Sequence, residues 1–287
     1  MINSYWSTKN KTLLSSPLNA TQRADAIREL AAIFLEQGFK RTDKLLLKLA
    51  TDVENGVTED PNKQLRKMLR IYGEEYAGND SDYARLFKFV SEVIIDSINN
   101  LGRAFDNKMI ELYPVLHKMN QSQTVLQELA LICLRARPLS DKEQYYVTCV
   151  MYALVVEGPF DQACRLLYFL YRSYRGKKAV SLAKVNKIEL HDLRNNLDGL
   201  SKGKSRIAFI GWNDRHLRNA IAHVGLEYIA GNNSMRFSDR RHTETVPWPK
   251  FNKYYHLTFG VSFVFLHVML LVRANNLAFG QLLIPRS

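Results

Sequence analysis

Hydrophobic residues recur at helical spacing along most of the chain, and this pattern predicts a mainly α fold. In the first half it predicts helices over Thr21–Gly38, Thr42–Asn55, Pro61–Tyr76, Asp80–Arg103, Asp106–Met119 and Gln121–Ala136. Residues that typically stop or start a helix separate them, such as Gly38, the pair Asp60-Pro61 and the turn Gly78-Asn79-Asp80. We therefore expect a helical N-terminal region.

The second half adds one signal for strands to this helical pattern. Helices are predicted over Ser140–Val156, Phe160–Arg175, Lys184–Leu200, a short segment that ends at Gly225, and Lys250–Asn276. Ser140, with Glu143 three residues later, forms a capping box at the start of the first of these helices. Leu226–Ala230 and Met235–Ser238 flank the turn Gly231-Asn232-Asn233, which predicts a short β-hairpin.

The turn between Arg135 and Asp141, which contains Pro138, is the best candidate for a domain boundary. It separates a helical region over residues 1–139 from a second unit over residues 140–287. A chain of 287 residues can form two ordinary domains or one large one. A connection inside one continuous helical body is therefore the alternative.

The most apolar segment of the chain lies in the last predicted helix. Leu257–Val272 has His267 as its only ionisable residue, and Thr258 and Ser262 add further polar groups. Its 16 residues fall short of the roughly 20 that a helix needs to span a bilayer. We therefore expect a core helix, buried in the protein or at a dimer interface, rather than a membrane span.

Cysteine usage and the N-terminus indicate the compartment. Cys133, Cys149 and Cys164 are scattered among apolar residues, which favours reduced, buried thiols over disulfides or a metal site. The first 15 residues are polar, include Lys9 and Lys11 and lack an apolar segment, so no signal peptide is expected. These features predict a cytoplasmic protein without a metal or other cofactor.

Positive charge is concentrated in the second half. The chain has 40 Lys and Arg against 28 Asp and Glu, a formal net charge of +12. Residues 1–140 contain 19 basic and 17 acidic residues, whereas residues 141–287 contain 21 and 11, so their net charges are +2 and +10. A polyanion such as RNA is the natural partner of such a surface. The alternative is a generally basic protein whose charge serves solubility.

One short predicted helix carries an arginine, an amide and an imidazole within the sequence Arg218-Asn219-Ala220-Ile221-Ala222-His223. Asn213 or Asp214 can cap the start of this helix, and Gly225 can end it. These signals define a helix of about three turns, which we call the motif helix.

The helical period separates the side chains of the motif helix into two faces. One is an apolar stripe that consists of Leu217, Ala220, Ile221 and Val224. On the other, Arg215, Asn219 and His223 follow at intervals of four residues, and Arg218 lies on the flank. This polar face points away from the core of its own protein, so it needs solvent or a partner.

The spacing of Arg218 and His223, with Asn219 directly after the arginine, resembles the Arg-x4–6-His signature of HEPN domains. These small helical domains occur in many prokaryotic RNases of toxin–antitoxin and phage-defence systems. The resemblance covers the chain from about Asp141 onward and implies a four- or five-helix bundle with a short hairpin after the motif helix. It also implies a metal-independent endoribonuclease that acts as a homodimer, because HEPN RNases build composite sites from two copies.

The motif residues suit RNA cleavage without a metal, which needs a base for the 2′-OH, an acid for the leaving oxygen and a cation for the transition state. His223 can transfer protons near neutral pH, and Arg218 can hold two phosphate oxygens at once. Asn219 can hydrogen-bond phosphate or ribose, or orient the imidazole. The structural alternative pairs Arg218 with Asp214 and makes His223 a cap of the helix C-terminus.

Further polar residues are candidates for the same site. Contacts with RNA are expected from Arg215, His216, Arg236, Arg240, Arg241 and His242, for which solubility is the alternative role. Glu157, next to Gly158-Pro159, is a candidate to orient Arg218 from another helix. The polar segment from His191 to Asn196 is a candidate to line the groove.

Three functions are compatible with these patterns. The leading one is the endoribonuclease in a toxin or antiphage role, in which residues 1–139 regulate it, sense a trigger or bind a partner. That partner would be an antitoxin or another defence-system protein, and no membrane is involved. The second function is a non-catalytic HEPN-like module that binds RNA or a nucleotide. The third is a helical scaffold or interaction protein with an accidental motif.

Overall fold

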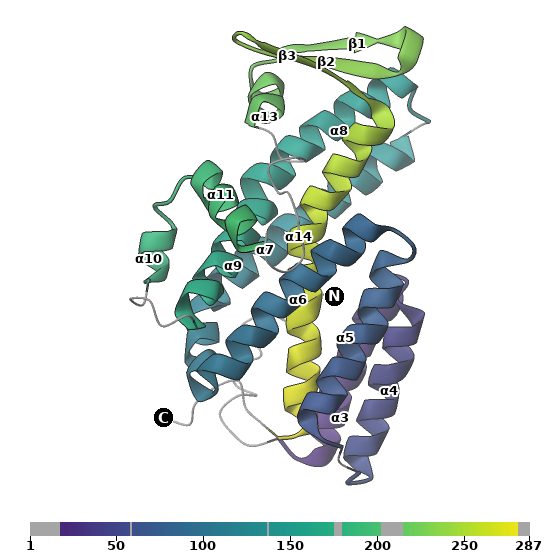
Figure 1. Cartoon of the computed structure of the whole chain (residues 1–287). Coiled ribbons are helices and arrows are strands. Elements are labelled where there is room, and N and C mark those ends of the chain that lie inside the picture. Colours follow the sequence, from purple (N-terminus) through teal and green to yellow (C-terminus); the bar gives the residue numbers. More distant parts are fainter. Residues whose placement is uncertain (1–17, 58, 137, 175–179, 202–214, 281–287) are drawn as a thin grey trace.

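The computed structural model describes residues 18–57, 59–136, 138–174, 180–201 and 215–280 (Figure 1). These residues form a mostly helical protein with one small antiparallel sheet of three strands near the C-terminal end. The expected mainly α class is therefore confirmed.

The first four helices match the expected ones to within a few residues. They are α3 (Ala20–Glu36), α4 (Lys40–Glu54), α5 (Pro61–Ala77) and α6 (Ser81–Leu101). Asn19, Asp60 and Asp80 cap three of them, because each accepts a hydrogen bond from a backbone N–H of the first turn. Local sequence signals are sufficient to set these boundaries.

A single long helix, α7 (Arg103–Ala136), replaces the two helices that were expected next. Met119 and Asn120 lie at the expected break, and both are buried. Gln123 donates a 2.7 Å hydrogen bond to the Ser262 hydroxyl in the last helix, which ties this part of α7 to the core. Tertiary burial therefore keeps the chain helical where the local pattern suggested an interruption.

The expected break at Glu157-Gly158-Pro159 is also absent. Two helices are joined there by a π-helical turn, and the three elements are α8 (Asp141–Val155), η1 (Val156–Phe160) and α9 (Asp161–Tyr174). Pro159 has no N–H to donate, and the wider π turn accommodates it without ending the helix. Glu157 therefore lies within one continuous helical segment that α8, η1 and α9 form together.

The remaining elements include the motif helix, which is α13. They are α10 (Leu182–Val185), α11 (Leu190–Ser201), α13 (Arg215–Ala222), β1 (Leu226–Ile229), the 3-10 turn η2 (Ala230–Asn232), β2 (Ser234–Asp239), β3 (His242–Pro247) and α14 (Trp248–Ala278). β1 and β2 form the expected hairpin, and β3 is an unexpected third strand that pairs antiparallel with β2. The hydrophobic pattern did not predict β3, because Val246 is its only buried residue.

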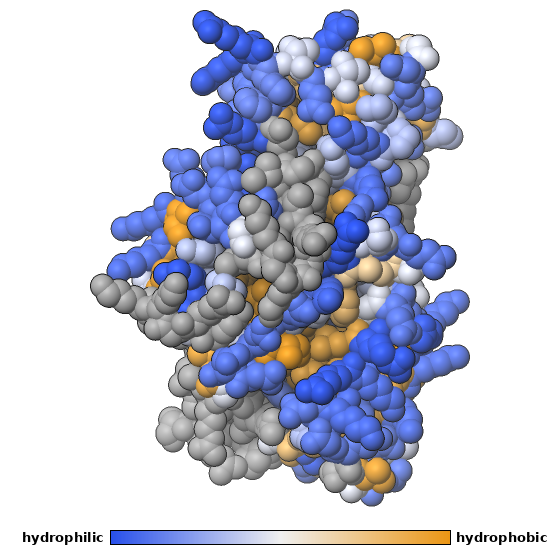
Figure 2. Space-filling view, in the orientation of Figure 1, coloured by the Kyte–Doolittle hydropathy of each residue, from blue (hydrophilic) through white to orange (hydrophobic). Residues whose placement is uncertain are grey.

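Helix α14 runs through the centre of the protein (Figure 1). It packs against α3, α5 and α6 of the first half and against α8 and α9 of the second. The helix is long and apolar enough to cross a membrane, but 83% of its most apolar stretch is buried inside the protein, as expected for a core helix. On the face seen in Figure 2, hydrophilic residues predominate and hydrophobic ones form smaller groups.

One hydrophobic core contains residues from both halves of the chain, including Phe34 and Leu86 from the first and Phe160 and Phe265 from the second. The division into residues 1–139 and 140–287 therefore does not coincide with two separate cores, and as a functional division it stays a prediction. All three cysteines are free thiols, with two of them buried and Cys133 partly exposed.

The end of α13 differs from the expectation that Gly225 stops the helix. Val224 adopts the left-handed conformation with φ of 57°, and the N–H groups of Val224 and Gly225 donate to the carbonyls of Ile221 and Ala220. This is a Schellman motif with valine where glycine is usual. Val224 consequently leaves the predicted apolar stripe and is 81% exposed, whereas Leu217 and Ala220 are buried as expected.

Gly225 is required for its close contact with β2. The Ser238 N–H donates a 2.8 Å hydrogen bond to the Gly225 carbonyl oxygen. A Cβ atom on Gly225 would lie 2.1 Å from the Ser238 carbonyl oxygen, so no side chain fits at this position. This contact fixes the end of α13 against the sheet.

We predict opposite effects of two substitutions at this helix end. Val224→Gly removes a β-branched residue from the left-handed conformation, so the free energy of unfolding should rise by about 1 kcal/mol. Gly225→Ala forces the strand and the helix end apart and should lower it by about 2 kcal/mol. Chemical denaturation measures both values. A Val224→Gly protein that is less stable than the wild type would contradict the strain argument.

His267 of α14 is buried among aromatic rings. Its ring stacks on Tyr72 with centroids 5.5 Å apart and also contacts Phe34 and Phe263. Nδ1 lies 2.8 Å from the Phe263 carbonyl oxygen, and Nε2 has no hydrogen-bond partner among the described residues. Burial lowers the pKa of His267 to about 4, because an imidazolium here would lose its hydration.

This lowered pKa makes stability depend on pH. The unfolded histidine titrates near 6.5, so between pH 6.5 and about 4 the unfolded chain binds a proton that the folded protein does not. Below pH 6.5 the free energy of unfolding should therefore fall, by about 3 kcal/mol at pH 4 from this residue alone. His267→Leu should remove that part of the fall in denaturation experiments across this range. An unchanged pH dependence in the variant would refute the assignment.

Candidate functional site

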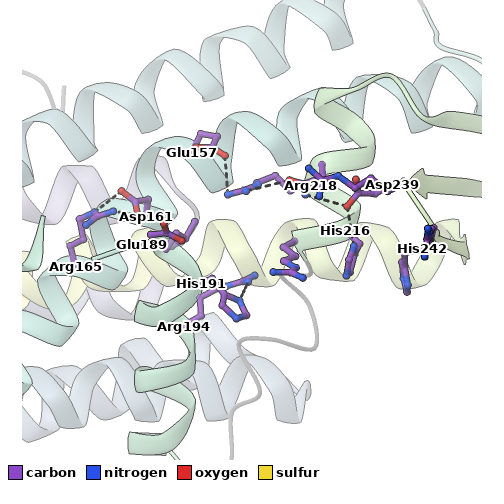
Figure 3. Close-up of a pocket in the computed structure, with 15 residues that line it drawn as sticks. Glu157, Asp161, Arg165, Glu189, His191, Arg194, His216, Arg218, Asp239 and His242 are labelled. Carbon is purple, nitrogen blue, oxygen red and sulfur yellow. Dashed lines mark hydrogen bonds and ion pairs between the residues drawn. The ribbon is translucent and has the colours of Figure 1, made fainter. Parts of the chain in front are cut away.

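The candidate site is a cavity of about 900 Å³ beside the motif helix (Figure 3). Six arginines line it: Arg165, Arg194, Arg215, Arg218, Arg240 and Arg241. The lining also includes His191, His216 and His242 and the carboxylates Glu157, Asp161, Glu189 and Asp239. Because arginines outnumber carboxylates, this lining favours anions, and phosphate in particular, whose oxygens match the fork of guanidinium N–H groups.

Segments far apart in the sequence supply these side chains. The π turn η1 and the first turn of α9 contribute Glu157 and Asp161, while α11 and the residue before it contribute Glu189, His191 and Arg194. Helix α13 and the turn between β2 and β3 close the other side. The cavity therefore depends on the packing of α13 against the sheet.

A series of polar side-chain contacts runs along one side of the cavity. Arg218 Nη1 lies 3.3 Å from Glu157 Oε1, and Arg218 Nη2 donates to Asn219 Oδ1 at 3.3 Å. Asn219 Nδ2 donates to Asp239 Oδ2 at 3.2 Å, and His216 Nδ1 lies 3.0 Å from the same oxygen. The expected pairing of Glu157 with Arg218 is thus confirmed, and Asp239 extends it to an imidazole (Figure 3).

Asp239 is the buried residue in this series of polar contacts, with 8% of its surface exposed. The hydrogen bonds from His216 and Asn219 hold the pKa of its carboxyl below the ordinary value, against the opposing effect of desolvation. Asp239 is therefore an anion at neutral pH. The His216 ring stacks on His242 with centroids 4.3 Å apart, which places two imidazoles side by side.

The turn that follows Asp239 carries backbone strain. Asp239 pairs with His242, so Arg240 and Arg241 form a two-residue turn, and Arg240 has a φ of 55°. Glycine or asparagine usually occupies such a position, because other residues are strained there. An arginine at this point lowers stability but adds a guanidinium to the cavity.

Arg165 has a structural role in the same cavity. It forms a bidentate pair with Asp161, at 2.8 and 2.9 Å, and donates to the carbonyl oxygens of Val185 and Ile188. These bonds hold the non-helical segment between α10 and α11. The helix expected over Lys184–Leu200 is therefore confirmed only from Leu190 onward, as α11, because Arg165 binds the carbonyl oxygens of Val185 and Ile188 ahead of it.

Most of the predicted site residues meet in the cavity. Arg215, His216, Arg218, Asn219, Arg240, Arg241 and His242 all line it. From the predicted polar segment, His191 and Arg194 also do so, with His191 Nδ1 3.2 Å from Arg194 Nη2. Arg236 does not, because it lies on β2 and pairs with Glu227 at 2.6 Å.

His223 is the predicted catalytic residue that the cavity does not include. It follows the last residue of α13, where its backbone N–H donates to the Asn219 carbonyl and its side chain is exposed. That side chain has no hydrogen-bond partner among the described residues. The proposed capping residues Asn213 and Asp214 lie outside the described residues.

Asp239, Asp161, Arg165 and Glu189 are cavity residues that the sequence did not single out. Asp239 directly precedes the basic run Arg240-Arg241-His242, and a lone carboxylate beside such a run was the available signal. The other three lie among ordinary charged residues of helical sequences, so no local signal separates them from solvated positions.

Within the described part of the chain, no group of three or more His, Cys, Asp and Glu side chains is arranged to hold a metal ion. No protein-family model, curated protein or solved structure matches the chain.

Proposed function

We propose that this protein is a metal-independent endoribonuclease of the HEPN type that acts as a homodimer in a toxin or antiphage role. The observation that carries the proposal is the position of Arg218 and Asn219 of the Arg-x4-His sequence. Both line a cavity rich in arginine, within a segment of net charge +10. A cavity of this charge suits the phosphate backbone of RNA.

Arg218 is the residue that holds the scissile phosphate in this proposal. Its present partner Glu157 is 64% exposed in its side chain, and the pair is separated by 3.3 Å. Exposed ion pairs of this kind contribute only about 0–1 kcal/mol, so a phosphate dianion or diester can replace the carboxylate. Asn219 keeps Arg218 oriented during this exchange, because its amide is itself fixed by Asp239.

His223 enters the site from a second copy of the chain. It is exposed at the end of α13 and lies outside the cavity of its own protomer. Two motif helices across a two-fold axis would place each His223 near the Arg218 of the other copy. His223 then transfers protons, while Arg215, Arg240 and Arg241 contact flanking phosphates.

Residues 1–139 serve as the regulatory or partner-binding part in this proposal. They are close to neutral overall, and α3, α5 and α6 pack on α14, which continues directly from the sheet. An antitoxin or defence-system protein that binds these helices would act on the site through α14.

A second candidate function is RNA or nucleotide binding without cleavage. The position of His223 favours it, because a single protomer combines the arginines of the cavity but not this imidazole. The two functions share the cavity and differ in whether bound RNA is cut.

We predict that His223→Ala and Arg218→Ala each reduce RNA cleavage in EDTA by about 100-fold or more. The melting temperature should change little, because neither residue belongs to the core. Mixed RNAs and gel analysis measure the rate, and the product should carry a 2′,3′-cyclic phosphate. His256→Ala and Arg70→Ala, at exposed positions outside the cavity, are the matched controls.

The same two variants test the composite site. If Arg218 and His223 come from different copies, a mixture of the two inactive variants should regain part of the activity, because some sites of the mixed dimer are intact. Full activity of His223→Ala, strict dependence on Mg²⁺, or a monomer in light scattering would contradict the proposal.

We also predict that Arg240→Gly weakens RNA binding while it stabilises the protein. The substitution removes a phosphate contact, so affinity should fall for all sequences alike and the salt dependence should become shallower by about one charge. It also relieves a strained φ, so the free energy of unfolding should rise by about 1 kcal/mol.

Filter binding at several salt concentrations and denaturation measure both effects. Arg70→Ala, which removes the same charge on α5, should leave binding nearly unchanged. An equal loss in both variants would mean that overall charge, and not the cavity, binds RNA.

A further inference from the structure

The cavity contains an imidazole, that of His216, which is better held than that of His223. His216 Nδ1 lies 3.0 Å from Asp239 Oδ2, and 32% of the His216 side chain is exposed while Asp239 is buried. A buried carboxylate that fixes one ring nitrogen, beside an imidazole that is open to the cavity, is the arrangement that enzymes use for proton transfer. The pairing is non-local, since the two residues come from α13 and from the end of β2.

We infer that His216, oriented by Asp239, is the general base of this cavity. The inference rests on the proposed ribonuclease function and adds a catalytic residue to it. His216 is the catalytic residue, and Asp239 is a positioning residue that acts through it.

The same series of polar contacts links His216 to Arg218, the proposed phosphate-binding residue. Arg218 donates to Asn219, Asn219 donates to Asp239, and His216 bonds the same Asp239 oxygen. One protomer therefore fixes the phosphate holder and the base relative to each other through two side chains. His223 has no such connection among the described residues.

The charge of Asp239 determines which ring nitrogen takes part. An ionised carboxylate accepts a hydrogen bond from Nδ1–H, which leaves the lone pair of the neutral ring on Nε2. Once Nε2 takes up a proton, the same carboxylate stabilises the imidazolium. His242 on β3 stacks on His216, and Arg215 on α13 and Arg240 in the turn are charged groups of the same cavity.

The reaction is then balanced over two histidines. His216 Nε2 takes the 2′-OH proton, the 2′-oxygen attacks phosphorus, and the bond from phosphorus to the 5′-oxygen breaks. His223 of the second copy gives its proton to that oxygen. The products are a 2′,3′-cyclic phosphate and a 5′-hydroxyl, and exchange with water restores both histidines.

The test compares His216→Gln, His216→Ala and Asp239→Asn in the full-length protein. The glutamine amide can still donate to Asp239 but cannot carry a proton, so this variant separates catalysis from folding. We expect kcat to fall by about 100-fold in both His216 variants with KM nearly unchanged. Free imidazole should restore part of the activity of His216→Ala, and Asp239→Asn should lower kcat more than it raises KM.

Each outcome separates the two proposals. If the wild type cleaves RNA and His216→Gln retains at least a third of kcat, the inference is wrong while the ribonuclease function stands. Failure of imidazole to restore any activity in a folded His216→Ala protein would also overturn it. If the wild type cleaves no RNA, the proposed function and this inference are both wrong. His256→Gln is the matched control, with activity expected at the wild-type level.

Discussion

The backbone contact between Gly225 and Ser238 is the constraint on which the candidate site depends. It holds the end of α13 against β2 at a distance that only glycine allows. Asn219 on the helix then meets Asp239, the residue after Ser238. A shift of the helix by one residue would turn Asn219 by about 100° and break this contact. The backbone conformation at the end of α13 therefore determines which side chains of this helix meet Asp239.

The arginines of the cavity are not equivalent, because their partners differ in burial. Arg165 is held by a bidentate carboxylate and two carbonyls, and its side chain is only 16% exposed. Replacing such partners would leave buried groups unpaired, so Arg165 stays structural. Arg218 has one largely exposed carboxylate, which water or a phosphate can displace at little cost. An arginine whose partner is exposed is therefore available to a ligand, whereas one whose partners are buried is not.

The sequence predicts the parts of this structure that depend on neighbouring residues. The capping box at Ser140 and the apolar stripe at Leu217 and Ala220 are local, and both are confirmed. The sequence offered Glu157 only as a candidate partner of Arg218, with Asp214 as the alternative, and the contact between them comes from the structure. The partnership of His216 with Asp239 was not predicted, because the two lie 23 residues apart and β3 had to be recognised first. The continuity of α7 was missed for the same reason, since tertiary burial and not local pattern decides it.

The positions of His216 and His223 bear on how one site can use both. His216 lies in α13 and His223 directly follows the helix, seven positions later, which at 1.5 Å per residue corresponds to about 10 Å along the helix axis. The attacking and leaving oxygens of a phosphodiester sit on opposite sides of one phosphorus atom, only a few ångströms apart. Both imidazoles must therefore reach one phosphate, and His216 lines the cavity whereas His223 of the same protomer does not. In the proposed mechanism the second proton would come from another chain, because the cavity does not include His223 of its own protomer.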